Sequence, residues 1–306
     1  MKNVRIRLTA RRGAALSTAA LTGAVALVGF AAGQAGASPA GHSGRDHVAL
    51  GDSYASAPLV PDQVDTTCFR SSHNYPSLVA AQRHADLTDV SCSGATTAQM
   101  TAPQGTAPAQ FTALERGTDV VTVSIGGNDI GFSSVIATCA GVTSSDPAGA
   151  PCRAHFTSGG SDRLAERVEQ TAPRIAEVIR GIHRRSPHAE VLVVGYPDLF
   201  PDDGAGCTSS SVPFAAGDFS YLRDTEKKLN SMLAGQAREN GARYVDTYTP
   251  TIGHDMCRPT GERWIESLAP ATPAAPAHPN AQGEQAMATA VVRTLSHHHG
   301  PHHSHH

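Results

Sequence analysis

The seven residues Asp119–Ile125 constrain the fold of this chain more than any other stretch. Their sequence, Asp-Val-Val-Thr-Val-Ser-Ile, is β-branched at nearly every position. Because β-branched residues stand on both faces of this run, the stretch predicts a strand that is buried on both faces. Strands of that kind belong to parallel sheets that helices cover on both sides. The chain is therefore expected to be an α/β protein.

Strand-like and helical segments alternate along the rest of the chain. Further short strands are predicted at 47–50, 87–91, 190–195 and 243–246. Helices are predicted at 74–84, 107–115, 161–185, 220–240 and 281–295, the third of them kinked at Pro173. This alternation, with connections long enough for crossovers, predicts a central parallel sheet of about five strands covered by helices on both faces.

Composition places the chain among ordinary soluble proteins. Of its 306 residues, 40% are hydrophobic and 17% are charged, and the net charge is -3. A chain of this size and balance predicts one large domain. Nucleic-acid binding needs a concentrated basic face, and the only basic run of this sequence is at its amino terminus. Nucleic acid is therefore not an expected partner.

The two ends of the chain differ from the segment between them. Residues 1–12 are basic, residues 13–32 are apolar, and Ala35-Gly36-Ala37 offers a small-residue cleavage site. This order predicts a secretory signal over 1–37, whose export route stays open, with a retained membrane anchor as the alternative. A secreted domain without stable membrane insertion is then expected over 38–296. The His-rich residues 297–306 are predicted to be a disordered tail.

Six cysteines in an exported chain predict three disulfides. The sequence alone permits many pairings. The expected one closes the shortest loops and joins Cys68 with Cys92, Cys139 with Cys152, and Cys207 with Cys257. A metal site is the alternative, but the chain has no Cys-x-x-Cys pair of the kind that structural zinc sites use. No metal is therefore expected.

A candidate nucleophile follows the first predicted strand. The strand runs into Gly51-Asp52-Ser53, which places a hydroxyl at the carboxyl edge of the sheet, where open α/β folds keep their reactive groups. A solvated turn is the alternative for this tripeptide. A serine hydroxyl is a weak nucleophile unless a base removes its proton. Ser53 therefore needs a base and hydrogen-bond donors nearby.

Two further turns follow predicted strands and supply such donors. Gly94 comes after the second strand, and Asn128 comes after the strand 119–125. The amides of Ser53 and Gly94 and the side-chain NH2 of Asn128 could converge on the oxyanion of an acyl substrate, each contributing about 3 kcal/mol in the transition state. A side chain at Gly94 would obstruct the substrate. Plain turn residues are the alternative for Gly94 and Asn128, but their placement at one sheet edge favours a site.

His278 is the candidate base. Seven of the sixteen histidines lie in the terminal tail, whereas His278 stands on a loop just before a helix that Asn280 caps, and Pro279 stiffens that loop. The fifth strand and the last helix would bring this loop back beside the first strand. An ordinary surface histidine is the alternative.

The motifs Gly51-Asp52-Ser53, Gly94, Gly126-Gly127-Asn128-Asp129 and His278-Pro279 stand in the order found in the SGNH (GDSL) hydrolases. The chain resembles this family from about residue 47 to residue 295, and its cysteines are similar to those of the secreted bacterial lipases and esterases with three disulfides. The resemblance implies a flavodoxin-like three-layer α/β/α sandwich and hydrolysis of carboxylic esters through an acyl-enzyme, without a metal or other cofactor. It implies that Ser53 is the nucleophile, that His278 is the base, and that the oxyanion hole comprises Ser53, Gly94 and Asn128.

One position departs from the family pattern. The family usually carries an aspartate three residues before the histidine, where this chain has Ala275. The imidazole then needs another acceptor for its Nδ1 proton, which fixes the tautomer. A main-chain carbonyl near Ala275 is the expected acceptor, which would make a Ser53–His278 dyad. Three acidic residues are alternative partners: Asp246, Asp255 and Glu266.

The expected substrate is a lipid or medium-chain acyl ester, and the expected protein is a monomer. Seven apolar residues could line an acyl groove or simply pack in the core: Leu59, Val60, Phe132, Val135, Ile136, Val212 and Phe214. A carbohydrate O-acetylesterase is the alternative enzyme. A secreted metal-binding protein is the non-enzymatic alternative, because tail histidines could chelate Zn2+, Ni2+ or Cu2+: His297–His299, His302, His303, His305 and His306.

Overall fold

The computed structural model describes residues 44–297, so the predicted signal 1–37 and the tail from 298 onward lie outside the described residues. Its centre is a parallel sheet with the strand order β4-β1-β5-β6-β7. The strands are β1 (Asp46–Gly51), β4 (Asp86–Asp89), β5 (Val120–Ser124), β6 (Glu190–Val194) and β7 (Arg243–Val245). This is the flavodoxin-like order among doubly wound folds. The predicted α/β class is confirmed.

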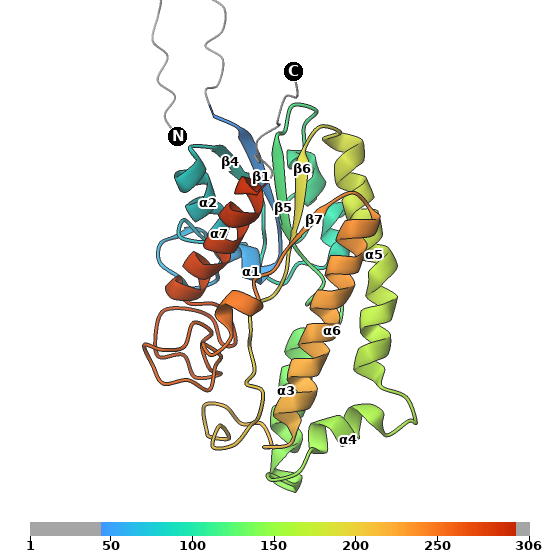
Figure 1. The fold of residues 1–306 in the computed structure, drawn as a ribbon, viewed down its shortest axis with the longest axis vertical. Coiled ribbons are helices and arrows are strands. Elements are labelled where there is room, and N and C mark those ends of the chain that lie inside the picture. The colour runs from blue at the N-terminus through green and yellow to red at the C-terminus, as the bar shows by residue number, and fades with distance from the viewer. Residues whose placement is uncertain (1–43, 298–306) are drawn as a thin grey trace, which may run out of the picture. The chain divides into compact units, whose positions relative to one another are not determined.

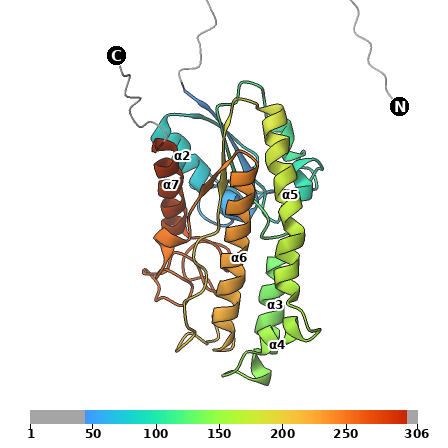
Figure 2. The same cartoon turned by 45° about the vertical axis from the view of Figure 1, so that its right-hand side comes forward.

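Helices cover both faces of the sheet (Figure 1). α2 (Tyr75–Arg83) packs against α7 (Ala281–Ser296) on one face, and α5 (Arg163–Arg185) packs against α6 (Asp218–Glu239) on the other. The two pairs stay together when the molecule is turned (Figure 2). β5 is buried at every position between these layers, as its β-branched sequence predicts.

Side-chain caps set where two of the long helices begin. The Asp162 carboxylate accepts the backbone N–H of Leu164 and of Ala165 at the start of α5. Asn280 caps α7 in the same way, as predicted, and this cap lies two residues after His278. Such caps satisfy backbone donors that have no partner within the helix. The end of α7 is thereby fixed beside the candidate base.

Several elements were not predicted. A short helix, α1 (Ser53–Ser56), leads into an antiparallel hairpin of β2 (Gln63–Asp65) and β3 (Arg70–Ser71), and two helices, α3 (Phe132–Val142) and α4 (Pro151–Thr157), precede α5. Four short 3-10 helices complete the described chain: η1 (Thr97–Met100), η2 (Gln110–Ala113), η3 (Thr143–Ser145) and η4 (Thr249–Thr251). The prediction of a helix over 107–115 was wrong. Only η2 forms there, and its buried Gln110 side chain bonds at both ends to the Gly51 backbone, each at 2.8 Å.

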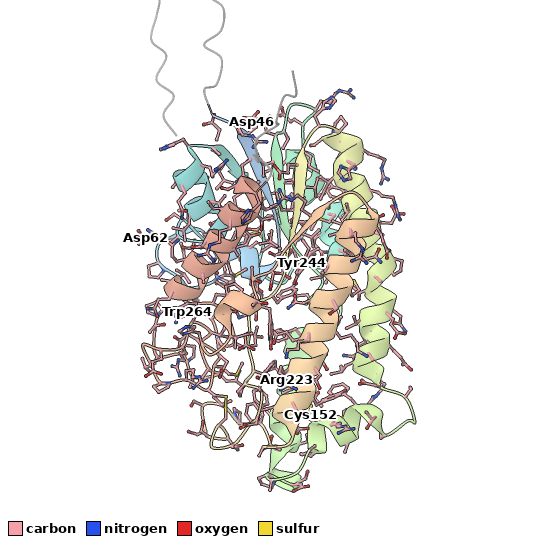
Figure 3. The ribbon with its side chains drawn as sticks, viewed as in Figure 1. Asp46, Asp62, Cys152, Arg223, Tyr244 and Trp264 are labelled. Carbon is pink, nitrogen blue, oxygen red and sulfur yellow. A yellow bond between two sulfur atoms is a disulfide. The ribbon has the colours of Figure 1, made fainter. Side chains whose placement is uncertain are left out.

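Three disulfides stabilise the connections outside the sheet. They join Cys68 with Cys92, Cys139 with Cys152, and Cys207 with Cys257, which are the shortest-loop pairs. The second of them links α3 to α4, and Figure 3 shows Cys152 at the end of the molecule away from the strands. Of the helices within 44–297, none has both the length and the apolar character that crossing a membrane requires.

The carboxyl edge of the sheet faces a large irregular region. Figure 3 shows Asp46 at the opposite, amino end of β1 and Trp264 in the loops beyond the carboxyl edge, beside the lower end of α7. These loops, together with α3 and α4, extend the molecule past the ends of the strands (Figure 1). Ligand sites of open α/β sheets form at this edge.

Candidate active site

The candidate nucleophile stands where β1 turns into α1. Gly51 ends the strand with φ +147, and a side chain there would come within 2.5 Å of the Ser124 carbonyl, so only glycine fits. Asp52 then caps α1 by accepting the Tyr54 backbone N–H at 2.9 Å. Ser53 is consequently the first residue of α1 and is 7% exposed. The turn holds its hydroxyl at the sheet edge.

The structure brings His278 against this hydroxyl. The ring Nε2 lies 2.7 Å from Ser53 Oγ, and the ring Nδ1 lies 2.7 Å from the Pro276 carbonyl. Because a carbonyl can only accept, Nδ1 carries the proton and Nε2 has a free lone pair. Burial lowers the pKa of His278, although the hydrogen bond to Pro276 opposes this. The imidazole is thus neutral and oriented to accept the serine proton.

The acceptor expected near Ala275 is the carbonyl one residue further on. The Ala275 carbonyl accepts the His278 backbone N–H instead, at 3.2 Å. Ala277 adopts a left-handed φ of +58 between them, which turns the Pro276 carbonyl toward the ring. The three carboxylates considered as alternatives do not bond to the ring within the described residues. They accept other donors: Thr249 for Asp246, Cys257 for Asp255 and Arg263 for Glu266.

A buried carboxylate nonetheless shapes the loop that carries His278. Glu266 is fully buried and pairs with Arg263 at 2.8 Å. It also accepts bonds from Ala271, Thr272 and Asn280, and its own backbone N–H donates to the His278 carbonyl at 2.9 Å. Burial alone would raise the pKa of Glu266, but these hydrogen bonds hold it below the ordinary value. An ionised Glu266 therefore organises residues 263–280.

Tyr54 connects the nucleophile to the base. Its hydroxyl donates to the Ala277 carbonyl at 2.7 Å, and its ring centroid lies 4.9 Å from that of His278. Since Tyr54 follows Ser53 directly in α1, the contact spans from the sheet edge to the His278 loop. Sequence reasoning did not single out this residue.

The predicted oxyanion donors follow three adjacent strands, with Ser53 after β1, Gly94 after β4 and Asn128 after β5. Asn128 Nδ2 donates one hydrogen to the Ala95 carbonyl at 2.9 Å and retains a second, because an amide NH2 carries two. Among the hydrogen bonds within residues 44–297, neither the Ser53 amide nor the Gly94 amide donates to a protein acceptor. That a side chain at Gly94 would obstruct the substrate stays a prediction. A side chain there would have room, with Gln104 Nε2 at 3.7 Å as its nearest neighbour, but φ is +82, which favours glycine.

A buried tyrosine that the sequence analysis missed links the nucleophile turn to the Asn128 loop. The Tyr196 hydroxyl donates to Asp52 Oδ2 at 2.7 Å and accepts the Gly127 backbone N–H at 2.8 Å. Burial raises the pKa of Asp52 to about 7; the hydrogen bonds from Tyr196 and Tyr54 oppose that rise, and the Asp129 charge adds to it. Tyr196 comes directly after the predicted strand 190–195, and that position was the signal that could have identified it.

A narrow apolar pocket with a cavity volume of about 50 Å³ adjoins Ser53. Ser53 and Asn128 line it, and its walls come chiefly from apolar residues of α3, α6 and the loop after β6: Phe132, Val135, Ile136, Leu199, Phe200, Leu222 and Leu229. Glu226 is also in the lining, but burial, together with the Asp198 charge, raises its pKa well above the ordinary value, so the carboxyl is neutral. The pocket therefore suits an apolar group.

Only part of the predicted acyl groove belongs to this pocket. Phe132, Val135 and Ile136 line it as expected. The other four residues do not: Leu59, Val60, Val212 and Phe214. Leu59 is half exposed, and Phe214 packs against Phe200 and Phe219 in the core. Over residues 44–297, no three His, Cys, Asp or Glu side chains are grouped so as to hold a metal.

Comparison with known proteins agrees with this geometry. Residues 49–286 match the GDSL-like lipase/acylhydrolase family. The chain belongs to this family. Lipase 2 of Streptomyces coelicolor is 41% identical over 91% of this chain and 95% of its own length.

Two solved structures from the same genus share the fold. Phospholipase A1 of Streptomyces albidoflavus has a TM-score of 0.68 and 27% identity, covering 83% of this chain and 99% of the other. The extracellular lipase of Streptomyces rimosus has a TM-score of 0.67 and 28% identity, with the same coverage. The GDSL protein described here is accordingly a carboxylic ester hydrolase of the lipase and esterase type.

Proposed function

We propose that Ser53 is the nucleophile and His278 the general base of this ester hydrolase, with the Pro276 carbonyl as the third member of the group. The observation that carries the proposal is the chain of two 2.7 Å contacts from Ser53 Oγ through the imidazole to that carbonyl. A nucleophile, a base and a group that orients the base are the parts that acyl transfer requires. Here a neutral carbonyl replaces the usual carboxylate.

The reaction follows from this geometry. His278 Nε2 takes the Ser53 proton as Oγ attacks the acyl carbon, and the imidazolium then gives that proton to the departing alcohol oxygen as the ester bond breaks. Water enters next. His278 removes a proton from it as its oxygen attacks the acyl carbon, and the imidazolium then returns that proton to Ser53 Oγ as the bond from Oγ to the acyl carbon breaks and the carboxylic acid leaves.

The negative oxygen that forms at each attack meets three donors. The proposed oxyanion hole comprises the Ser53 and Gly94 amides and the second hydrogen of Asn128 Nδ2, which are supported as donors by their having no protein acceptor among the described residues. Each such donor contributes about 3 kcal/mol when its bond strengthens in the transition state.

The acyl group is proposed to occupy the apolar pocket behind Ser53. Its apolar lining of α3 and α6 side chains fits a hydrocarbon chain. A carbohydrate substrate would instead require polar groups that can bond to its hydroxyls. The lipase and phospholipase A1 relatives support lipid or medium-chain esters over the O-acetylesterase alternative.

Labelling with a fluorophosphonate probe tests the catalytic assignment. Intact protein should react at Ser53, located by mass spectrometry of the modified peptide, and Ser53→Ala should lose both labelling and ester hydrolysis while keeping its melting temperature. Ser56→Ala is the matched control, because Ser56 is buried in the same helix one turn away. Turnover retained by Ser53→Ala would contradict the assignment.

A chain-length profile with p-nitrophenyl esters tests the acyl pocket. Val135→Trp should fill the pocket and shift preference toward acetyl esters, because long acyl chains lose their space. Ala137→Trp places the same side chain on the exposed side of α3 and should keep the profile. A Val135→Trp profile identical to that of the unmodified enzyme would place the acyl chain elsewhere.

We also propose that the enzyme acts outside the cell. Its three disulfides support this, since such bonds persist in oxidising compartments. Amino-terminal sequencing of the protein from culture medium should show a start near residue 38. The monomeric state stays a prediction.

A further inference from the structure

A continuous line of hydrogen bonds runs behind the proposed oxyanion hole. It begins at the Gly127 amide, passes through the Tyr196 hydroxyl and ends at the Asp52 carboxylate, with distances of 2.8 and 2.7 Å. Gly127 precedes Asn128, and Asp52 precedes Ser53. The line therefore connects the residue before one proposed oxyanion donor with the residue before the nucleophile.

We propose that Asp52 and Tyr196 are positioning residues. They hold the loop that carries Asn128 at a fixed distance from Ser53, and they do so only while Asp52 is ionised. This inference rests on the proposed function, because it concerns the same oxyanion hole. It assigns neither residue a contact with substrate. It makes turnover depend on a second ionisation besides that of His278.

The direction of the hydrogen bonds links positioning to ionisation. The Gly127 N–H can only donate, so the Tyr196 oxygen is an acceptor there and its own hydrogen goes to Asp52. Asp52 Oδ1 already accepts the Tyr54 amide, so both carboxylate oxygens are acceptors. A proton on Oδ2 would oppose the Tyr196 hydrogen and weaken the contact to Gly127.

Tyr196 is itself rigidly held, so it can transmit position. Asn230 accepts the Tyr196 backbone N–H and donates to its carbonyl, each at 2.9 Å. The ring packs edge-on against Tyr54 with centroids 4.9 Å apart. A hydroxyl fixed in this way defines where the Gly127 amide must lie.

The charges around Asp52 place its ionisation near neutral pH. Burial raises its pKa to about 7, against the hydrogen bonds from Tyr196 and the Tyr54 amide, and the Asp129 carboxylate raises it further. Arg174 lies 3.6 Å from Asp129 and partly offsets that charge. The charge of Asp52 therefore changes near neutral pH, whereas burial lowers the pKa of His278 from its ordinary value. Of the two ionisations, that of Asp52 should dominate the acid side of the profile.

The test compares Tyr196→Phe with a matched variant across pH. Tyr221→Phe removes another tyrosine–aspartate bond, the part-buried 2.9 Å contact to Asp162, and Tyr221 does not line the pocket beside Ser53. Tyr196→Phe should lower kcat by about tenfold above neutral pH with little change in KM, because misplaced donors weaken transition-state contacts. It should also lose the rise in kcat near pH 7, while Tyr221→Phe keeps the unmodified profile.

Asp52→Asn is the second variant and mimics the protonated carboxyl. It should keep fluorophosphonate labelling at Ser53 and show a reduced kcat. The only remaining fall of kcat on the acid side should be the one caused by protonation of His278, below pH 6.5. A normal kcat and pH profile in Tyr196→Phe would overturn the positioning role, and so would a rise near pH 7 that survives in Asp52→Asn. Failure of Ser53 to label in the unmodified enzyme would instead overturn the proposed function, so the two failures are distinguishable.

Discussion

The two sides of the proposed site are held by different means. Ser53, Gly94 and Asn128 stand on loops that leave β1, β4 and β5, three adjacent strands of the buried sheet. His278 stands instead on an irregular segment outside the sheet. One isolated bridge inside this segment joins Ile265 to Pro279, and single backbone bonds such as that from the Ala275 N–H to the Pro58 carbonyl connect it to other loops. The sheet thus fixes the position of Ser53 and the oxyanion donors (the nucleophile side), whereas contacts outside the sheet fix the position of His278 (the base side).

This difference determines where a single substitution does the most damage. On the nucleophile side the backbone is fixed by strand pairing, so changing a side chain removes its chemistry and leaves the frame intact. On the base side one carboxylate, Glu266, accepts bonds from four residues and organises the frame itself. Substitutions there should affect stability and catalysis together.

Asn128→Ala should have the largest effect among substitutions that sharpen this comparison. It removes one oxyanion donor and should lower kcat by about a hundredfold with KM nearly unchanged. Melting temperature should change little, because the loop backbone remains tied to β5 and Tyr196. Steady-state kinetics and calorimetry measure both. An effect on KM alone would mean that Asn128 holds substrate and not the transition state.

Glu266→Gln should have the second largest effect, because it disrupts the segment that carries His278 and does not remove a catalytic group. It leaves the Arg263 charge buried without a partner, which costs about 3 kcal/mol of unfolding free energy. We expect kcat to fall by about tenfold, because His278 loses part of its frame. Glu177→Gln is the matched control, since the Glu177–Arg180 pair is exposed and contributes little. Equal stability of the two variants would contradict the role assigned to Glu266.

The stability difference should depend on pH in a definite direction. The pKa of Glu266 is lower in the folded protein than its ordinary value. The stability that the ionised carboxylate contributes is therefore fully present at pH values above the ordinary pKa, and it is lost as the pH falls through the pKa of the folded protein. Denaturation at neutral and acidic pH should therefore show the unmodified protein and Glu266→Gln converging as pH falls.

Much of the fold was predictable because the buried strands are short and strongly patterned. β5 and β6 coincide with runs of Val, Ile and Leu, β7 falls within the predicted strand 243–246, and Asn280 marks the start of α7. The region between β5 and α5 was not predicted. α3 has no side-chain cap at its start, and the disulfide from Cys139 to Cys152 rather than a local signal ties α3 to α4.

The site was predictable where chemistry sits next to a strand end and less so elsewhere. Ser53, Gly94 and Asn128 follow strands, so topology alone places them at one edge. The acceptor of the His278 proton depends on the left-handed turn at Ala277, which no sequence pattern specifies, so the expectation of a carbonyl near Ala275 could not name the Pro276 carbonyl itself. Tyr196 is a single aromatic residue whose partners, Asp52 and Gly127, are distant in sequence, so only the structure connects them.

Ala275→Asp should have the smallest effect and decides how complete the base side is. This substitution supplies the carboxylate that the family usually places three residues before the histidine. Because Nδ1 already donates to the Pro276 carbonyl at 2.7 Å, and the Ala275 backbone is held by its N–H bond to Pro58 at 2.9 Å, the new carboxylate has no vacant partner to take. The value of kcat/KM should change by no more than about threefold, a free-energy difference smaller than one ordinary hydrogen bond. Ala275→Asn is the control for size without charge. A gain of about a hundredfold in Ala275→Asp alone would mean that the carbonyl orients His278 poorly and that the dyad is incomplete.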